Sequence, residues 1–194
     1  MPESVVIEHC SPTLAGIKTG NMFSVRTDDE PDIDKEIRRL NRILEDKGLA
    51  VIPLRKTDEY TLVYVYRPGR LKKDLNDPKA QKILSDLGYT NSEGAWCLAE
   101  LVKRMKDLSS FPHEVGLFLG YPPSDVECFM KGSRAGVKCC GCWKAYSEPE
   151  SAQRTFRDYE RCKEMYLAMH KKGKTLAQLA VVTDKNVAGH KTEV

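Results

Sequence analysis

The chain of 194 residues is long enough for one well-packed core and short for two independent catalytic domains. Charged residues make up 30% of it, yet Lys and Arg number 31 against 28 Asp and Glu. This near balance gives no strong global field, so we expect neither nucleic acid nor a membrane as a partner. The first residues lack the pattern of a secretory signal, and no apolar run approaches a membrane span. These features predict a cytoplasmic protein.

Seven cysteines occur in the chain. In a cytoplasmic protein they are expected as free thiols, small buried side chains or ligands, and not as a disulfide framework.

The first half of the chain alternates strand and helix patterns. Residues 4–8 form a β-branched run that predicts a strand, and Ser11 and Pro12 suit the start of a helix that follows it. A second helix is predicted from Pro31 to Gly48, because Ile33, Ile37, Leu40 and Leu44 recur at helical spacing. Residues 49–54 and 60–66 predict an antiparallel hairpin.

The second half is richer in helix patterns. Helices are predicted over residues 78–87 and 93–108, from Pro122, over residues 149–172 and from Thr175, and strands over 115–119 and 137–146. Residues 183–194 have too little apolar content to fold alone and predict a loose tail.

These patterns together predict an α+β fold. We expect a single domain over residues 1–182, with a mainly antiparallel sheet of about four to five strands, packing helices and a long C-terminal helix. The order of the strands and the oligomeric state do not follow from the sequence.

Cys10 is the first candidate for chemistry. At the predicted start of a helix, the helix dipole would favour a thiolate over a thiol. The competing interpretation is a buried cysteine that closes the first strand. His9 would point away from Cys10 in an extended segment, so the two do not form an obvious pair.

His113 is the second candidate. It would begin a strand whose apolar positions share its face, which suits a base at the edge of a cleft and equally suits a structural histidine. Glu114 would point to the other face, so it is not expected to orient His113.

The segment from Cys139 to Tyr146 contains one C-x-x-C spacing. Because a strand is predicted here, Cys140, Cys142, Lys144 and Tyr146 would share one face, and Cys139 and Trp143 the other. A lone C-x-x-C on a strand is a weak zinc signal, and any metal would have to recruit His9, Cys10 or His113. Neither of the two common phosphate-loop spacings, G-x-x-x-x-G-K-S/T and G-x-G-x-x-G, is present.

Three segments resemble a bacterial family of uncharacterised proteins, typical of anaerobes and described only as a domain of unknown function. They are His9 to Lys18 (HCSPTLAGIK), Pro112 to Pro122 (PHEVGLFLGYP) and Cys140 to Tyr146 (CGCWKAY). The resemblance implies a single domain of about this length in which the three segments meet, and no particular activity. It also implies that Cys140 belongs to the family pattern, whereas Cys139 and Cys142 do not.

A more distant similarity concerns the papain-like amidases of the NlpC type. Cys10-Ser11 at a helix start and the later His113 strand are similar to the Cys and His segments of those enzymes, in the same order. In that family the cysteine attacks an amide carbonyl and the histidine is the base. Glu114 is an insertion relative to that pattern, and no third residue is evident to orient His113.

Three functions remain open on this basis. The first is a cysteine-dependent intracellular enzyme for an amide, thioester or related acyl group, with Cys10 as nucleophile and His113 as base. Lys144, Tyr146 and Trp143 would then bind a small-molecule or peptide-like substrate. The second is a noncatalytic metal- or redox-cofactor-binding protein using His9, Cys10, His113 and Cys140. The third is a plain interaction module, and the sequence names no cofactor.

Overall fold

The computed structural model describes residues 1–90, 94–107, 110–132 and 136–183. Its helices are α1 (Glu3–Leu14), α2 (Ile33–Leu44), α3 (Pro68–Leu75), α4 (Pro78–Asp86), α5 (Gly94–Met105), α6 (Val115–Phe118), α7 (Pro123–Met130), α8 (Pro149–Lys171) and α9 (Leu176–Leu179). Its strands are β1 (Gly20–Arg26), β2 (Ala50–Lys56), β3 (Tyr60–Tyr66), β4 (Cys139–Cys140) and β5 (Lys144–Ala145), and a 3-10 turn (Glu45–Lys47) follows α2.

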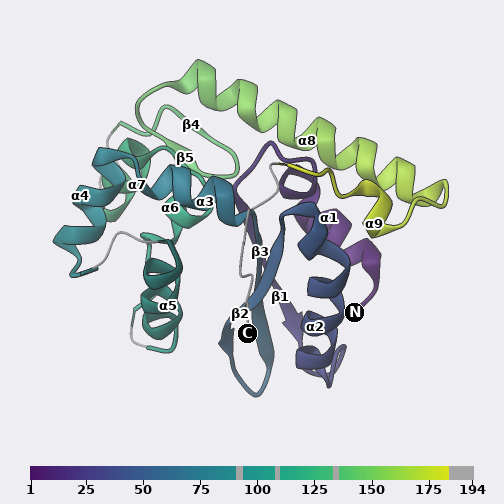
Figure 1. The fold of residues 1–194 in the computed structure, drawn as a ribbon. Coiled ribbons are helices and arrows are strands. Elements are labelled where there is room, and N and C mark those ends of the chain that lie inside the picture. The colour runs from purple at the N-terminus through teal and green to yellow at the C-terminus, as the bar shows by residue number, and fades with distance from the viewer. Residues whose placement is uncertain (91–93, 108–109, 133–135, 184–194) are drawn as a thin grey trace, which may run out of the picture.

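A three-stranded antiparallel sheet lies at the centre, in the order β1-β3-β2. Because side chains alternate along the central strand, Val63 and Val65 join one hydrophobic cluster and Tyr64 joins the other. Figure 1 shows α1, α2 and α9 on one side of this sheet and α3 to α7 on the other. The mixed α+β fold is therefore confirmed, but the predicted sheet of four to five strands is wrong. The described residues form a three-stranded sheet and a separate two-stranded hairpin of β4 and β5.

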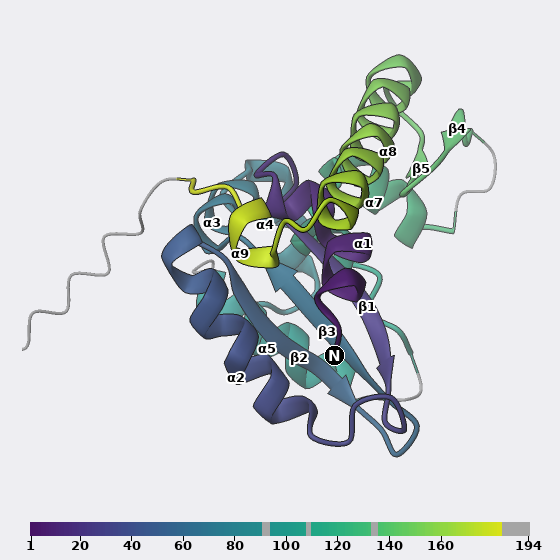
Figure 2. The same cartoon turned by 90° about the vertical axis from the view of Figure 1, so that its right-hand side faces the viewer.

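Helix α8 connects the two sides. Its first half lies against the β4–β5 hairpin, and its second half packs on α1, where Cys162 and Tyr166 join the first cluster. Figure 2 shows the same relationship from the side, with α8 beside α1 and the hairpin beyond it.

Several predicted elements are confirmed. Helix α2 buries Ile37, Leu40 and Leu44, and the Asp32 carboxylate caps its start by accepting from the Lys35 N–H. The predicted hairpin is β2 paired with β3. Helices α4, α5, α7, α8 and α9 also lie where they were predicted, except that residues 93 and 108 fall outside the described ranges.

The prediction for the N-terminus is wrong. Residues 4–8 are helical, within α1, and the segment after Leu14 leads into strand β1 instead of continuing a helix. Val6, Ile7, Cys10 and Leu14 recur at helical spacing and are fully buried. The packing of this face on α8 and the sheet outweighs the local β preference of Val and Ile.

Two further strand predictions are wrong. Residues 115–118 form helix α6, since a short apolar run suits a buried helix as well as a buried strand. Residues 137–146 do not form one strand, because the chain reverses between β4 and β5. Helix α3, which begins at Pro68, was not predicted.

The buried guanidinium of Arg67 joins distant parts of the chain. It donates to the carbonyls of Thr13 and Leu14 at the end of α1, each at 2.7 Å, and to those of Lys47 and Val181, at 3.0 and 2.8 Å. It also donates to the Thr183 hydroxyl at 2.5 Å. Residue 183 is therefore held in place, and the rest of the predicted tail, 184–194, lies outside the described residues.

Within the described ranges, no helix combines the length and the apolar content that crossing a membrane requires.

Candidate functional site

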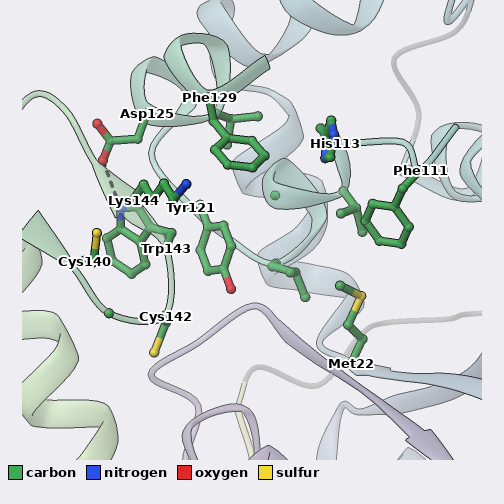
Figure 3. Close-up of a pocket in the computed structure, with 15 residues that line it drawn as sticks. Met22, Phe111, His113, Tyr121, Asp125, Phe129, Cys140, Cys142, Trp143 and Lys144 are labelled. Atoms are coloured by element: carbon green, nitrogen blue, oxygen red, sulfur yellow. Dashed lines mark hydrogen bonds between the residues drawn. The ribbon is translucent and has the colours of Figure 1, made fainter. Parts of the chain in front are cut away.

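A cavity of about 490 Å³ lies between helices α6 and α7 and the β4–β5 hairpin (Figure 3). Most of its wall is aliphatic or aromatic: Met22, Phe111, Val115, Leu119, Tyr121, Val126, Phe129 and Trp143. Five polar side chains complete it: His113, Asp125, Cys140, Cys142 and Lys144.

Asp125 of helix α7 fastens the hairpin to the rest of the molecule. Its buried carboxylate accepts a hydrogen bond from the Trp143 indole at 2.9 Å. It also accepts from the Tyr146 N–H at 2.9 Å and from the N–H and hydroxyl of Ser147 at 3.1 and 3.0 Å. With four donors already bound, this carboxylate stabilises the hairpin and is poorly placed to receive a ligand.

Trp143 is the centre of an aromatic wall. Its ring stacks on Tyr121 at a centroid distance of 5.0 Å and meets Phe156 of α8 edge-on at 4.5 Å. Gly141 is required where the turn approaches α8, because a Cβ there would lie 2.4 Å from the Phe156 ring.

Two basic side chains lie over the opposite wall. The Lys144 ammonium is 5.4 Å from the centroid of the Phe129 ring, and the His113 imidazole meets the same ring edge-on at 5.1 Å. Neither side chain has a hydrogen bond or ion pair with a described residue. Both are exposed, so both are available to a ligand.

His113 does not lie on a strand, contrary to the prediction. It is in the turn that precedes α6, and it lines the cavity through this turn. Glu114 is buried and interacts elsewhere: it accepts from the Tyr89 hydroxyl at 3.1 Å and lies 3.6 Å from the Arg104 guanidinium.

Cys10 lies in a different place from the one the sequence predicted. Helix α1 begins at Glu3, so Cys10 is in the second half of a helix and gains nothing from a helix N-terminus. It is fully buried in the first cluster, and burial raises the pKa of its thiol far above the usual value. Cys10 does not line the cavity, so the structure does not bring it to the cavity wall that holds His113.

The predicted metal ligands are also not brought together. His9 is exposed and stacks on Phe23 at 5.1 Å, whereas Cys10 is in the core and His113 and Cys140 line the cavity. Within the described parts of the chain, no group of three or more His, Cys, Asp or Glu residues is arranged to hold a metal ion.

The C-x-x-C segment lies on the hairpin and its turn, not on a continuous strand. Cys140 and Cys142 are exposed and line the cavity, while the Cys139 thiol lies 3.6 Å from the Pro149 carbonyl. Of the three residues predicted to bind substrate, Trp143 and Lys144 line the cavity. Tyr146 contributes its backbone N–H to Asp125 and is not part of the wall.

Sequence reasoning missed Lys18. This side chain is only 4% exposed, and its ammonium lies 5.3 Å from the centroid of Tyr121 and 5.6 Å from that of Tyr159 on α8. The three segments that were expected to meet do so around Tyr121, which contacts Lys18 of the first and Trp143 of the third. The only signal was the position of Lys18 at the end of the first of these segments.

Comparison with known proteins gives a family and no relative of known activity. No curated protein and no solved structure matches the chain. A family model matches residues 6–180, which is nearly the whole described chain. The chain therefore belongs to the family described as protein of unknown function (DUF3793).

Proposed function

We propose that this protein binds a small, largely apolar or aromatic molecule that carries a negative charge. The observation that carries the proposal is the 490 Å³ cavity, in which aromatic walls surround two unpaired basic side chains, Lys144 and His113. Cavities of about 300 to 1,000 Å³ with apolar walls and a few polar groups are typical ligand sites.

The charges of the wall favour an anion over a cation. Asp125 is the carboxylate of the wall, and four donors already occupy it. Lys144 has no acidic partner among the described residues and lies over an aromatic ring. A negative group bound beside Lys144 would therefore pair with a charge that is otherwise unmatched.

A matched pair of dyes tests this proposal. 1-Anilinonaphthalene-8-sulfonate and N-phenyl-1-naphthylamine share an aromatic body, and only the first carries a sulfonate. We expect saturable binding of both with one site per chain, weakened by Phe129→Ala. Lys144→Gln should weaken binding of the sulfonate about twofold to fivefold and leave binding of the neutral dye unchanged.

The control is Lys82→Gln, which removes an exposed lysine of α4 that pairs with Asp86. It should change neither affinity. Unchanged far-UV circular dichroism during each titration confirms that the dye binds the folded protein. If neither dye gives a saturable single site, or if Phe129→Ala has no effect on either, the proposal fails.

A second candidate function is the cysteine-dependent acyl chemistry expected from the sequence, with a different nucleophile. Cys140, Cys142 and His113 line the same cavity, and the His113 ring has no hydrogen bond to a described residue. In this scheme a cavity thiol attacks the carbonyl of an ester or thioester and His113 accepts the thiol proton. The bond to the leaving group breaks as the new thioester forms, and His113 returns the proton to the alcohol or thiol that leaves.

p-Nitrophenyl acetate tests this second candidate. We expect one equivalent of p-nitrophenol to be released rapidly, with the acetyl group on Cys140 or Cys142 by peptide mass spectrometry. His113→Ala should slow the release at least tenfold, whereas His9→Ala, which changes an exposed histidine outside the cavity, should not. Acetylation that is equally fast in Cys140→Ser, Cys142→Ser and His113→Ala would exclude this function.

A further inference from the structure

Four polar side chains from separate parts of the chain meet beside Tyr121. Lys18 comes from the loop between α1 and β1, Tyr121 from the loop after α6, Cys142 from the hairpin turn and Tyr159 from α8. They are close enough to interact electrostatically, Lys18 with Cys142, and Tyr121 with both Cys142 and Tyr159. In Figure 3, Cys142 and the hydroxyl of Tyr121 point toward the loop that precedes β1.

None of these four polar groups has a hydrogen bond to a described residue. The Lys18 ammonium has no ion pair with a described residue either, although only 4% of the residue is exposed. Two tyrosine rings lie near it, but ring faces do not replace the hydrogen bonds that an ammonium makes in water. A lysine that is 4% exposed and has no protein partner leaves its ammonium available to a bound anion.

The hydrogen-bonding chemistry of the cluster selects an oxyanion. Burial raises the pKa of Tyr159 to about 12 and that of Tyr121 also above its usual value, so both phenols keep their protons and can donate. Burial lowers the pKa of Lys18 to about 8, which leaves most of it charged at neutral pH. Asp74, whose carboxylate accepts from the Thr19 hydroxyl, acts electrostatically on Tyr159 and forms no ion pair with Lys18.

The Lys18 ammonium is also within reach of solvent. Among the described residues, Arg55 Nε is the only fully buried side-chain nitrogen or oxygen that lacks a hydrogen-bond partner. Lys18 Nζ lacks a partner as well, so it must retain contact with water. The ammonium is therefore open to solvent on at least one side.

We propose that Lys18, Tyr121 and Tyr159 bind the oxyanion of a small ligand, a phosphate, sulfate or carboxylate group, with the Cys142 thiol beside it. The oxyanion has two chemical sources: a free inorganic anion, or the acid group of an organic molecule whose body extends past Tyr121. Tyr121 and Cys142 line both this site and the apolar cavity, whereas Lys18 and Tyr159 do not line the cavity, so variants of these two residues test the site separately from dye binding.

Titrations at constant ionic strength test the site. Inorganic phosphate, sulfate and benzoate are compared with chloride by isothermal calorimetry and by the thermal unfolding midpoint. We expect at least one oxyanion to bind with one site per chain and to raise the midpoint above that in chloride. Phosphate or sulfate binding identifies a free inorganic anion, and benzoate binding alone identifies the acid group of an organic ligand.

Matched variants locate the binding. Lys18→Met should weaken the oxyanion at least tenfold, and Tyr159→Phe about threefold, while Lys144→Met should not change its affinity. Lys18→Met removes a buried charge and keeps the apolar length, so it should fold, and its far-UV circular dichroism and urea unfolding report whether the fold is intact. The proposal is overturned if no oxyanion binds more tightly than chloride, or if Lys18→Met and Tyr159→Phe both bind as the unchanged protein does.

Discussion

The Trp143 indole donates a hydrogen bond of 2.9 Å to the buried carboxylate of Asp125, and so joins the hairpin to helix α7. Asp125→Ala removes the acceptor for this bond and for the donors of Tyr146 and Ser147. We expect the free energy of unfolding in urea to fall by about 2 to 4 kcal/mol. Asp86→Ala breaks only an exposed pair with Lys82 and should change it by less than about 0.5 kcal/mol. If both variants lose the same free energy of unfolding, the hydrogen bonds to Asp125 do not hold the hairpin to α7.

Arg67 should be one of the most sensitive polar positions. Arg67→Lys cannot reach all five acceptors. The Thr13 and Leu14 carbonyls each keep a backbone donor, but those of Lys47 and Val181 depend on Arg67, so we expect a loss of about 3 kcal/mol or more. The control, Arg70→Lys, alters an exposed side chain that donates to the Gly16 carbonyl, and should lose about 1 kcal/mol or less. Thermal and urea unfolding measure both. A loss from Arg67→Lys no larger than that from Arg70→Lys would show that the buried bonds contribute little.

Two glycines with positive φ separate backbone strain from crowding. Gly132 has φ +67° and open space around it, so Gly132→Ala should cost about 1 to 2 kcal/mol through backbone strain alone. Gly120 has φ +78°, and a Cβ there would lie 2.6 Å from the Thr19 hydroxyl. Gly120→Ala should therefore cost about 1 to 3 kcal/mol more than Gly132→Ala. Equal unfolding midpoints in urea for the two variants would show that the loop around Gly120 adapts.

The stability of the protein should depend on pH through Lys18. Burial lowers its pKa to about 8 from the usual 10.5. Between these values the unfolded chain binds a proton that the native protein does not, so stability rises with pH in this window. Relative to Lys18→Met, the unchanged protein should gain about 1 kcal/mol between pH 7 and 9, measured by urea unfolding.

The other groups facing Lys18 act in the opposite direction. Burial raises the pKa values of Cys10, Tyr121 and Tyr159, so above about pH 9 the unfolded chain loses protons that the native protein keeps. The contribution of these groups to the free energy of unfolding therefore falls as pH rises. Measurements are therefore compared below that pH and as a difference from Lys18→Met. A difference that is constant from pH 7 to 9 would show that Lys18 keeps an ordinary pKa.

Part of the fold follows from local pattern alone. The spacing of Ile37, Leu40 and Leu44 predicts α2, because its apolar residues form one stripe on an otherwise polar helix. The β-branched runs of β2 and β3 are separated by a short polar turn and pair as predicted. These elements have one buried face or strong turn signals, so sequence periodicity is enough to define them.

Other elements depend on contacts that periodicity does not contain. Val5, Val6 and Ile7 favour strands locally, yet they lie in α1 because that helix packs on α8, far away in the sequence. The residues of the site likewise divide into those that the sequence predicted and those that only the fold brings together. The sequence predicted that His113, Trp143 and Lys144 would contribute, and they share a cavity.

Asp125 and Lys18 gave no such signal. Asp125 is on a short helix, and its importance arises from a hairpin that begins well after it in the chain. Lys18 looks like an ordinary surface lysine until the fold places Tyr121 and Tyr159 over it.

Helix α8 contacts the hairpin, the surroundings of Lys18 and the first hydrophobic cluster. Phe156 touches the hairpin, Tyr159 lies at Lys18 and Tyr166 is in the first core, all on one helix of 23 residues. A helix of that length is a stiff rod of about 35 Å. The contact of Phe156 with Trp143, the contact of Tyr159 with Lys18 and the packing of Tyr166 therefore lie on one rigid helix, so a movement of the hairpin that carried Phe156 along would also act on the packing of Tyr166.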